Sequence, residues 1–508
     1  MMLAQVLFLL MLYILGVLVG LLFKKHLPFP FISLTGFLWG AIVWVLIALG
    51  CLSLSISYSL LSMSLLVAAV FVVLVAVHIK QGTWRHNRSE ISWLVGTMLG
   101  LTVVVSAATQ FNFSAATYDS ISQILLGRTI AYEGFTESTT RSLASWGVFL
   151  PLLQSASVFL GEGYLYALQP AFAFTFLLTF FYIGHRAGRQ SFFGARVALV
   201  LALLTTLTLA STLFIVFQTF YIHNNFPAAI YLFVAVSTFW LALREQNNTW
   251  LIFAMLALTC FSLLRTETLL FALIFLSLVI ATGQLSYRVR LYIVMPYVGI
   301  LLIWYVKLLL AIGPGTDILD PKRTLAIIAI LIGFGVGVGL SRLRWVENYI
   351  LPILPMLMIG GLLCALVFVF VQKPTHMHTS LGNIWQNMIF YGWWGATWLI
   401  VFILLLFAFL QPKIPYEHLF SYGIAAFFML LLALSFMRSP YRLVWWDSAN
   451  RIITHIIPIV FFYLLLKYGH GLSAGNTNVD FIKNRRRAIL AMAGVGVLLV
   501  VISYSVSP

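Results

Sequence analysis

Charged residues are scarce in this chain. Of its 508 residues, 8% are charged and 62% are hydrophobic, whereas a soluble domain carries about 25% charged residues. No water-soluble fold buries so much apolar surface, so we expect lipid to be the solvent of this protein. The apolar residues form long continuous runs and do not alternate with polar ones, which favours membrane-spanning helices over a β-barrel.

Cysteine is also rare, and the few acidic residues show no metal-binding pattern. Cys51, Cys260 and Cys364 all lie inside apolar runs without the spacing of metal ligands, and we interpret them as small packing residues. Asp317 and Asp320 are two carboxylates with no third ligand nearby, which is weak evidence for a cation site. We therefore expect neither a metal ion nor another cofactor.

Long polar segments are absent as well. No stretch between the apolar runs is long and polar enough to form a soluble domain, and no internal repeat is visible. Lys24 and Lys25 follow the first apolar run instead of preceding it, and no small-residue cleavage site comes after them. This pattern is typical of a retained first helix. We predict a single transmembrane domain over residues 1–508.

The apolar runs are numerous and of similar length. A helix needs about 20 apolar residues to cross a hydrocarbon core roughly 30 Å thick. By that criterion we predict an all-α polytopic membrane protein, a bundle of about sixteen spans and at least about thirteen. The predicted spans are 2–23, 33–55, 60–78, 92–109, 163–184, 195–215, 226–243, 249–264, 268–283, 291–311, 324–341, 350–371, 391–410, 419–436, 452–467 and 488–505.

The distribution of basic residues indicates which loops face the cytoplasm. The formal net charge is +16, but Lys and Arg punctuate the apolar runs and form no surface stripe, so we expect no nucleic-acid partner. Most of them fall in loops on one side of the predicted bundle, including the cluster 483–487, and these loops are assigned to the cytoplasm. The functional side is then external, in a multi-pass cell or inner membrane.

The longest predicted external loop covers residues 110–162. It contains Asp119, Glu133 and Glu137 in an otherwise acid-poor chain. Apolar residues in 120–132 recur on one helical face, which predicts a helix lying in the membrane interface. The apolar stretch 145–160 is interpreted as a second interfacial or re-entrant helix, because a full span there would place the later basic loops outside.

The sequence TYDSISQILLGRTIAYEG in this loop resembles the first external loop of the GT-C superfamily of membrane glycosyltransferases. That superfamily includes the protein O-mannosyltransferases and the aminoarabinose transferases that act on lipid A. In the family an acidic residue follows an early span, and then come a helix with an aromatic or basic position and a glycine. The matching residues are Asp119, Arg128 and Gly134. Ser122 and Gln123 stand where many relatives have a histidine.

Two further stretches are similar to elements of the same family. LLRTETLLFAL places Arg265 and Glu267 at the predicted external end of a middle span. WWDSANRIITHIIPI resembles the late external segment, with Arg451, His455 and Pro458 at the matching positions. The large C-terminal soluble domain of the oligosaccharide-transferring branch has no counterpart here, which favours transfer of a single sugar.

The resemblance implies a reaction. The donor is a polyprenyl-phosphate sugar, and the acceptor hydroxyl belongs to a lipid, a glycan or a protein. Asp119 acts as the base that takes the hydroxyl proton, and the lipid phosphate leaves with inversion at the anomeric carbon. Arg451 stabilises that phosphate, in a pocket that it shares with Asp119. The implied substrate-binding residues are Arg128, Glu133, Arg265, Glu267, Arg442, Arg451 and His455.

Other interpretations stay open at this point. Asp119 can be an ordinary solvated acid, Arg265 and Glu267 can simply pair with each other, and residues 223–225 either line a sugar site or form a polar turn. One alternative function is an undecaprenyl-linked polysaccharide polymerase or ligase, for which Arg438, Arg442 and Arg451 are suited and Asp119 is dispensable. A lipid-linked sugar flippase or transporter is ranked lower, because the ionisable residues cluster at the predicted external rim and no repeat is seen.

Overall fold

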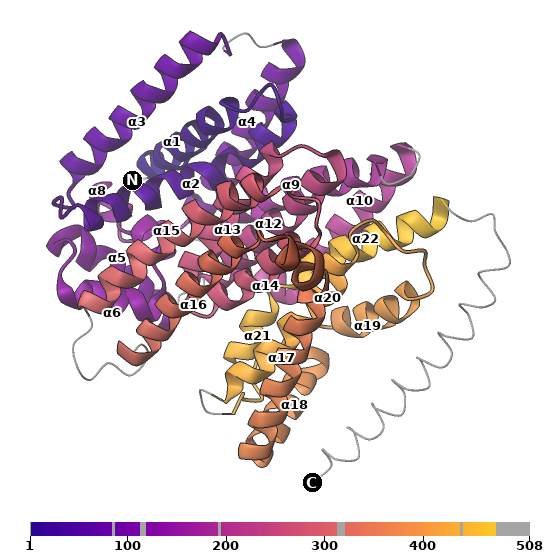
Figure 1. Cartoon of the computed structure of the whole chain (residues 1–508). Helices are drawn as coiled ribbons and strands as arrows, with labels where there is room; N and C mark the ends of the chain where they lie inside the picture. Colours follow the sequence, from indigo (N-terminus) through magenta and orange to yellow (C-terminus); the bar gives the residue numbers. More distant parts are fainter. Residues whose placement is uncertain are drawn as a thin grey trace. The chain divides into compact units, whose positions relative to one another are not determined.

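The structure is a computed structural model that describes residues 2–83, 87–111, 118–190, 195–311, 321–436 and 440–473. Within these ranges the chain forms helices and no β-strand, which confirms the prediction of an all-α fold (Figure 1). The acidic pair Asp317 and Asp320, Arg438 and the predicted span 488–505 lie outside the described residues.

The helices follow one another with short connections. In the first half of the chain they are α1 (Met2–Leu21), α2 (Phe29–Ser53), α3 (Leu60–Gln81), α4 (Arg88–Phe111), α5 (Tyr118–Glu133), α6 (Glu137–Trp146), α7 (Phe149–Gln154), α8 (Ala156–Phe159), α9 (Leu168–Gln190), α10 (Ala195–Ser211), α11 (Leu213–Gln218) and α12 (Asn225–Glu245). They continue with α13 (Thr249–Leu264), α14 (Thr268–Ala281), α15 (Tyr287–Ala311), α16 (Pro321–Leu340), the π-helix η1 (Val346–Ile350), α17 (Leu351–Gln372), α18 (Pro374–Gln386), the π-helix η2 (Asn387–Tyr391), α19 (Thr397–Ala408), α20 (His418–Ser435), α21 (Ser448–Ile453) and α22 (Ile457–Ser473).

Ten helices in the described residues are long and apolar enough to cross a membrane. Each coincides with one of the predicted spans, so the chain has the make-up of a polytopic membrane protein. Several other predicted spans coincide with shorter apolar helices, and the predicted count of about sixteen is not confirmed. The ten are α1, α2, α3, α4, α9, α12, α15, α16, α17 together with η1, and α20.

The predicted span 391–410 starts later than expected. Trp393 (φ 61°) and Gly395 (φ 56°) adopt left-handed backbone conformations, which an α-helix cannot contain. The residues before them belong to the π-helix η2, and α19 begins only at Thr397. The result is a helix of 12 residues, about 18 Å long, in place of the longer span that the apolar run predicted.

The stretch 145–160 is not the single helix that was predicted. It holds the end of α6 and two short helices, α7 and α8, which meet at Ser155. Gly147 ends α6 with φ 82°, and a Cβ there would lie 1.7 Å from the Leu264 carbonyl oxygen, so only glycine fits. All residues of α7 are buried. The position of this stretch relative to a bilayer stays a prediction.

The chain divides into two compact units. The first comprises Met1–Thr179, Phe217–Leu273 and Gly283–Pro352, and the second comprises Phe180–Val216, Ile274–Thr282 and Ile353–Pro508. Each unit is discontinuous in the sequence and contains candidate spans. The prediction of one membrane domain over the whole chain stays a prediction.

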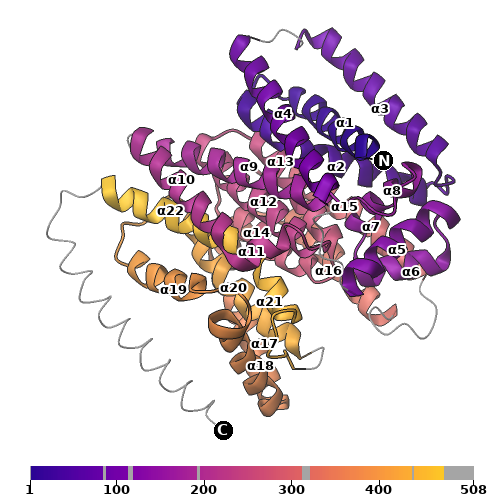
Figure 2. The same ribbon diagram turned by 180° about the vertical axis from the view of Figure 1, so that it is seen from behind.

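The first unit is built around α12 and the pair α1–α2. Every residue from Asn225 to Leu243 is buried, and α12 packs against α13. The helices α1 and α2 lie side by side (Figures 1 and 2). A Cβ on Gly40 would lie 1.7 Å from the Leu12 carbonyl oxygen and one on Gly16 would lie 1.8 Å from that of Gly36. These glycines therefore let the two backbones touch.

Four glycines of α16 have the small-xxx-small spacing that is typical of close helix packing, but they behave differently. Gly333, Gly337 and Gly339 of α16 have nothing within 4 Å of a built Cβ, and Gly335 meets only side-chain atoms at ordinary contact distance. Their spacing alone could not distinguish an exposed face from a packed one.

In the second unit α22 packs against α10, α19 and α20 (Figure 2). Lys467 on α22 is buried, and its Nζ lies 2.8 Å from Oε1 of Glu417, which also accepts a hydrogen bond of 2.9 Å from the Tyr463 hydroxyl. The buried charge is thus paired, as an apolar surrounding requires.

Candidate functional site

Asp119 lies in the first turn of α5, where the helix dipole favours negative charge. The helix is held close to α7 at Gly127, where a Cβ would lie 2.6 Å from the Pro151 carbonyl oxygen. The Asp119 side chain is 25% exposed. A carboxylate in this position is accessible to a reactant on one side while it contacts the protein on the other.

Two buried rings reach the Asp119 carboxylate from the segment before α12. The Tyr221 hydroxyl donates a hydrogen bond of 3.4 Å to Oδ2, and Nε2 of His223 lies 3.8 Å from the same oxygen. The second distance exceeds that of a hydrogen bond, so this contact is electrostatic. The two rings stack with their centroids 5.3 Å apart, and both are 2% exposed.

The start of α12 orients the histidine. Asn225 is the first residue of α12, and the N–H of such a residue has no acceptor within the helix. Nδ1 of His223 accepts that N–H at 3.2 Å and also accepts the Asn225 side-chain amide at 2.7 Å. The histidine therefore caps the helix, and its Nδ1 edge is turned towards Asn225.

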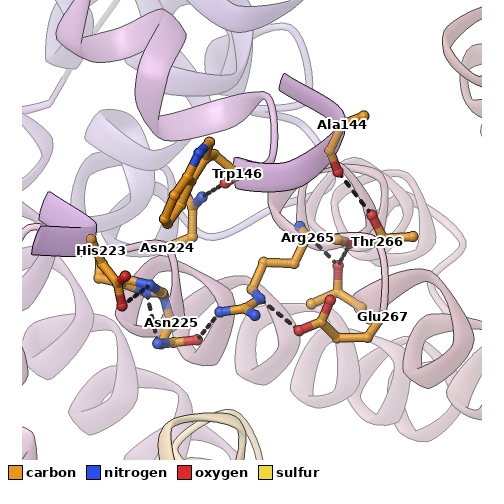
Figure 3. A network of polar contacts seen from close by, with 10 residues as sticks. Ala144, Trp146, His223, Asn224, Asn225, Arg265, Thr266 and Glu267 are labelled. Atoms are coloured by element: carbon orange, nitrogen blue, oxygen red, sulfur yellow. Dashed lines mark hydrogen bonds and ion pairs between the residues drawn. The ribbon is translucent and has the colours of Figure 1, made fainter. Parts of the chain in front are cut away.

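Asn225 connects the histidine to an ion pair. Its Oδ1 accepts a hydrogen bond of 3.3 Å from Arg265, whose Nε donates one of 2.7 Å to Glu267. Figure 3 shows the run from His223 through Asn225 and Arg265 to Glu267. Together with Asp119 these residues form one continuous polar chain, which we call the Asp119–Glu267 chain.

Arg265 and Glu267 lie at the break between α13 and α14. Arg265 has an extended backbone (φ −155°, ψ 157°) that ends α13, and the Thr268 hydroxyl donates 2.5 Å to its carbonyl oxygen. Hydrogen bonds connect this break to α6 and to the start of α7. The Val148 N–H donates to the Leu263 carbonyl oxygen at 3.0 Å, and the Thr266 hydroxyl donates to that of Ala144 at 3.2 Å.

The turn 223–225 is held on two further sides. The Asn224 side chain donates 2.6 Å to the Trp146 carbonyl oxygen (Figure 3). The Gln169 amide donates 2.9 Å to the carbonyl oxygen of His223. All three turn residues are buried. They therefore form an ordered polar turn that belongs to the Asp119–Glu267 chain, and Asn224 serves to fix it.

A small hollow adjoins Arg265 on the side of α15. It is lined by Ala144, Gly147, Ser262, Arg265, Thr266 and Tyr305, among others. The Arg265 and Glu267 side chains are 15% and 9% exposed, so their ion pair is largely removed from solvent. Charged groups this deeply buried are retained only when they are paired.

Arg128 and Glu133 do not join Asp119. Arg128 lies nine positions further along α5, on the opposite face and about 13 Å away along the axis, and it donates 3.2 Å to the Gly163 carbonyl oxygen. Glu133 is the exposed last residue of α5. The family resemblance grouped these residues by order in the sequence, whereas the pitch of the helix separates them.

Arg442, Arg451 and His455 belong to the second unit. Arg442 is exposed, Arg451 is partly buried on α21, and His455 is fully buried. Because α21 ends at Ile453, His455 does not follow Arg451 on the same α-helix. The prediction that Asp119 and Arg451 share a pocket concerns residues of different units and stays a prediction.

Asp447 organises the loop that carries Arg442. Its Oδ1 accepts a hydrogen bond of 2.9 Å from the Arg442 N–H, and its Oδ2 accepts one of 2.8 Å from Ala449, which caps α21. Burial raises the pKa of this carboxyl, and the two N–H donors and Arg451 partly offset the increase. The sequence resemblance did not single out this residue.

Among the described residues, no group of three or more His, Cys, Asp or Glu side chains is arranged to hold a metal ion. Comparison of the chain with models of protein families, with curated proteins and with solved structures gives no match. The geometry of the site is therefore the basis for any functional assignment.

Tyr221 was not anticipated from the sequence, and its connection to Asp119 spans about a hundred residues. A signal was nevertheless present, since Tyr221, His223 and Asn225 alternate within a short polar interruption of two apolar runs. Polar residues within membrane-compatible sequence are energetically unfavourable, and they are therefore candidates for a functional site.

Proposed function

We propose that this protein is a membrane glycosyltransferase that moves a single sugar from a polyprenyl-phosphate donor to an acceptor hydroxyl. The observation that supports the proposal is a partly exposed carboxylate, Asp119, at the end of a buried chain of polar side chains. The described part of the chain also holds ten candidate spans. Such spans suit a donor whose lipid tail lies in the bilayer.

In the proposed reaction Asp119 is the general base. The acceptor hydroxyl loses its proton to the carboxylate as its oxygen bonds to the anomeric carbon. The bond from that carbon to the phosphate oxygen breaks, and polyprenyl phosphate leaves with the electron pair. Attack opposite the leaving group inverts the anomeric configuration, and the transition state has oxocarbenium character.

The remaining predicted residues take different parts in this proposal. Arg265 and Glu267 support the base through Asn225 and His223 and do not meet the donor directly. Arg451, with Arg442 or His455, is assigned to the leaving phosphate, because a guanidinium stabilises the charge that grows there. Arg128 and Glu133 are not needed by the mechanism.

The test uses the full-length protein in lipid nanodiscs. Radiolabelled polyprenyl-phosphate hexoses and pentoses are supplied as donors, with extracted envelope lipids, glycans and proteins as acceptors. We expect the wild type to transfer label from at least one donor. We expect Asp119→Asn to lower the rate by about 10²- to 10⁴-fold, since the amide cannot take a proton.

The matched control is Glu137→Gln, which removes an exposed acid that pairs with Arg141 on the same helix, α6. It should transfer at the wild-type rate. If Asp119→Asn also transfers at that rate, Asp119 is not the base, and the result favours the polymerase or ligase alternative. Donor movement across the bilayer without transfer would instead indicate a flippase.

A further inference from the structure

The Asp119–Glu267 chain contains two groups whose role in hydrogen bonding is invariant. A guanidinium has only N–H donors and is not deprotonated in proteins, so the atom of Asn225 that faces Arg265 at 3.3 Å must be Oδ1. The side-chain Nδ2 is then the atom that faces His223. The backbone N–H of Asn225 is the second invariant donor, and it also points at His223.

Both donors of Asn225 meet the same nitrogen of the histidine. Nδ1 of His223 receives the backbone N–H at 3.2 Å and the side-chain amide at 2.7 Å. An atom that accepts two N–H groups carries a lone pair and no proton. A neutral imidazole then holds its proton on Nε2, and Nε2 is the atom that lies 3.8 Å from Oδ2 of Asp119.

We propose that His223 is a positioning residue for Asp119, held by Arg265 and Asn225 as the tautomer whose Nε2–H faces the carboxylate. The N–H groups then all point in one direction: Arg265 donates to the Asn225 amide, Asn225 donates to the His223 ring, and the Nε2–H of His223 faces Asp119. The catalytic part of the proposal rests on the function proposed above, whereas the tautomer does not.

The opposite tautomer meets two repulsive contacts. A proton on Nδ1 would point at the backbone N–H of Asn225, and the Asn225 side chain would have to turn its NH₂ group towards Arg265. Each contact sets a donor against a donor in a buried place, where an unsatisfied polar group is destabilising.

Titratable and polar side chains contact His223 at both ring nitrogens and on one face of the ring. Asp119 faces Nε2, the Tyr221 ring stacks on one face, and Asn225 faces Nδ1. Beyond Asn225, the next side chain in the Asp119–Glu267 chain is Arg265, and Glu267 follows it. Glu267 holds the guanidinium in the position that orients Asn225, so it acts on the histidine at a distance.

The tautomer is measured directly by ¹⁵N chemical shifts. The full-length protein with ¹⁵N-labelled histidine is studied in nanodiscs from about pH 5 to about pH 8, around the ordinary titration range of histidine. The His223 signals are identified as those missing in His223→Gln. We expect the neutral ring to show a bare-nitrogen shift for Nδ1 and a protonated shift for Nε2. A neutral ring with its proton on Nδ1 in the wild type would overturn the proposal.

Asn225→Asp tests the direction of the chain. The carboxylate has no N–H to donate, so it replaces the side-chain donor with an acceptor. The backbone N–H of residue 225 still points at Nδ1, so we expect the protonated share of Nδ1 to rise in this variant without becoming complete, which the ¹⁵N shift reports. If the Nδ1 shift is the same as in the wild type, the amide does not set the tautomer, and the proposed relay is wrong.

The positioning role is measured on sugar transfer by the full-length protein. We expect His223→Ala to lower the maximal rate by about 10- to 100-fold, as for a displaced catalytic group, with little change in KM. His223→Gln keeps an N–H donor near Asp119 and should recover part of the rate. If His223→Ala transfers at the wild-type rate, positioning is refuted while the proposed function stands. If Asp119→Asn retains full transfer, the function fails, and the tautomer is judged by the ¹⁵N shifts alone.

Discussion

At the scale of single residues, the Arg265–Glu267 pair is a largely buried ion pair of the first unit. Both side chains are largely buried, with Nε and Oε1 2.7 Å apart. Removing one partner of such a pair leaves an uncompensated charge, which costs more than the pair itself contributes. As long as Arg265 is present, the fold therefore needs Glu267 to balance its charge.

Glu267→Ala should destabilise the protein by about 3–5 kcal/mol, because it leaves the Arg265 guanidinium without its carboxylate. The measurement is thermal or denaturant unfolding in detergent micelles. Glu137→Ala is the control, since it breaks an exposed pair with Arg141 and exposed pairs contribute about 0–1 kcal/mol. Equal losses in the two variants would contradict the burial argument.

At the scale of helices, close packing depends on individual glycines and not on their number. Gly40 and Gly50 both lie on α2 and are ten residues apart. A Cβ at Gly40 would collide with the α1 backbone, whereas one at Gly50 would meet nothing within 4 Å. The two positions therefore form a matched pair for measuring what the α1–α2 contact is worth.

Gly40→Ala should separate α1 from α2 and cost several kcal/mol, about the range of severe overpacking. Gly50→Ala should be neutral or stabilising by up to about 1 kcal/mol, because alanine favours the helix. Unfolding in micelles and the yield of folded protein report both effects. Similar behaviour of the two variants would mean that α1 and α2 do not touch at Gly40.

Asp447→Ala removes the cap of α21 and should cost about 1–2 kcal/mol. Because burial raises the pKa of Asp447 in the folded state, the folded protein holds this proton more tightly than the unfolded chain does. The stabilisation from Asp447 is therefore largest below its unfolded pKa of about 3.9 and declines as the pH rises through the folded value.

The difference in stability between wild type and Asp447→Ala should accordingly be larger near pH 4 than at neutral pH. Unfolding of both proteins over a pH series measures it. A difference that grows towards neutral pH would show that the ionised carboxylate is the favoured form.

At the scale of the whole molecule, the ten candidate spans fit a membrane protein, and the distribution of Lys and Arg predicts which loops face outward. Glu133 at the end of α5 and Arg342 after α16 are both exposed, and the prediction places them on opposite sides. In a variant without Cys51, Cys260 and Cys364, Glu133→Cys should react with a membrane-impermeant maleimide in intact cells. Arg342→Cys should react only after permeabilisation, and the reverse pattern would invert the topology.

The sequence predicted the helical fold well because apolar runs that are long enough to cross a bilayer have few alternatives. It predicted the ends of α19 and the 145–160 stretch poorly, since left-handed positions such as Trp393 and Gly147 leave the run apolar while they stop the helix. Asp119, Arg265 and Glu267 were proposed as site residues, and the structure joins them in one polar chain. Arg128 lies on the opposite face of α5 from Asp119 and donates to Gly163, and its assignment to substrate binding stays a prediction.

The sequence by itself determined the membrane-compatible character of this protein, its all-helical class and most of its long apolar helices. These properties follow from composition and from the length of the apolar runs. Only the tertiary structure decided that His223 and Asn225 link Asp119 to Arg265. That link spans three segments far apart in the chain, and the hydrogen bonds that define it depend on where helices begin and end in space. Periodicity within one segment carries no information about such contacts.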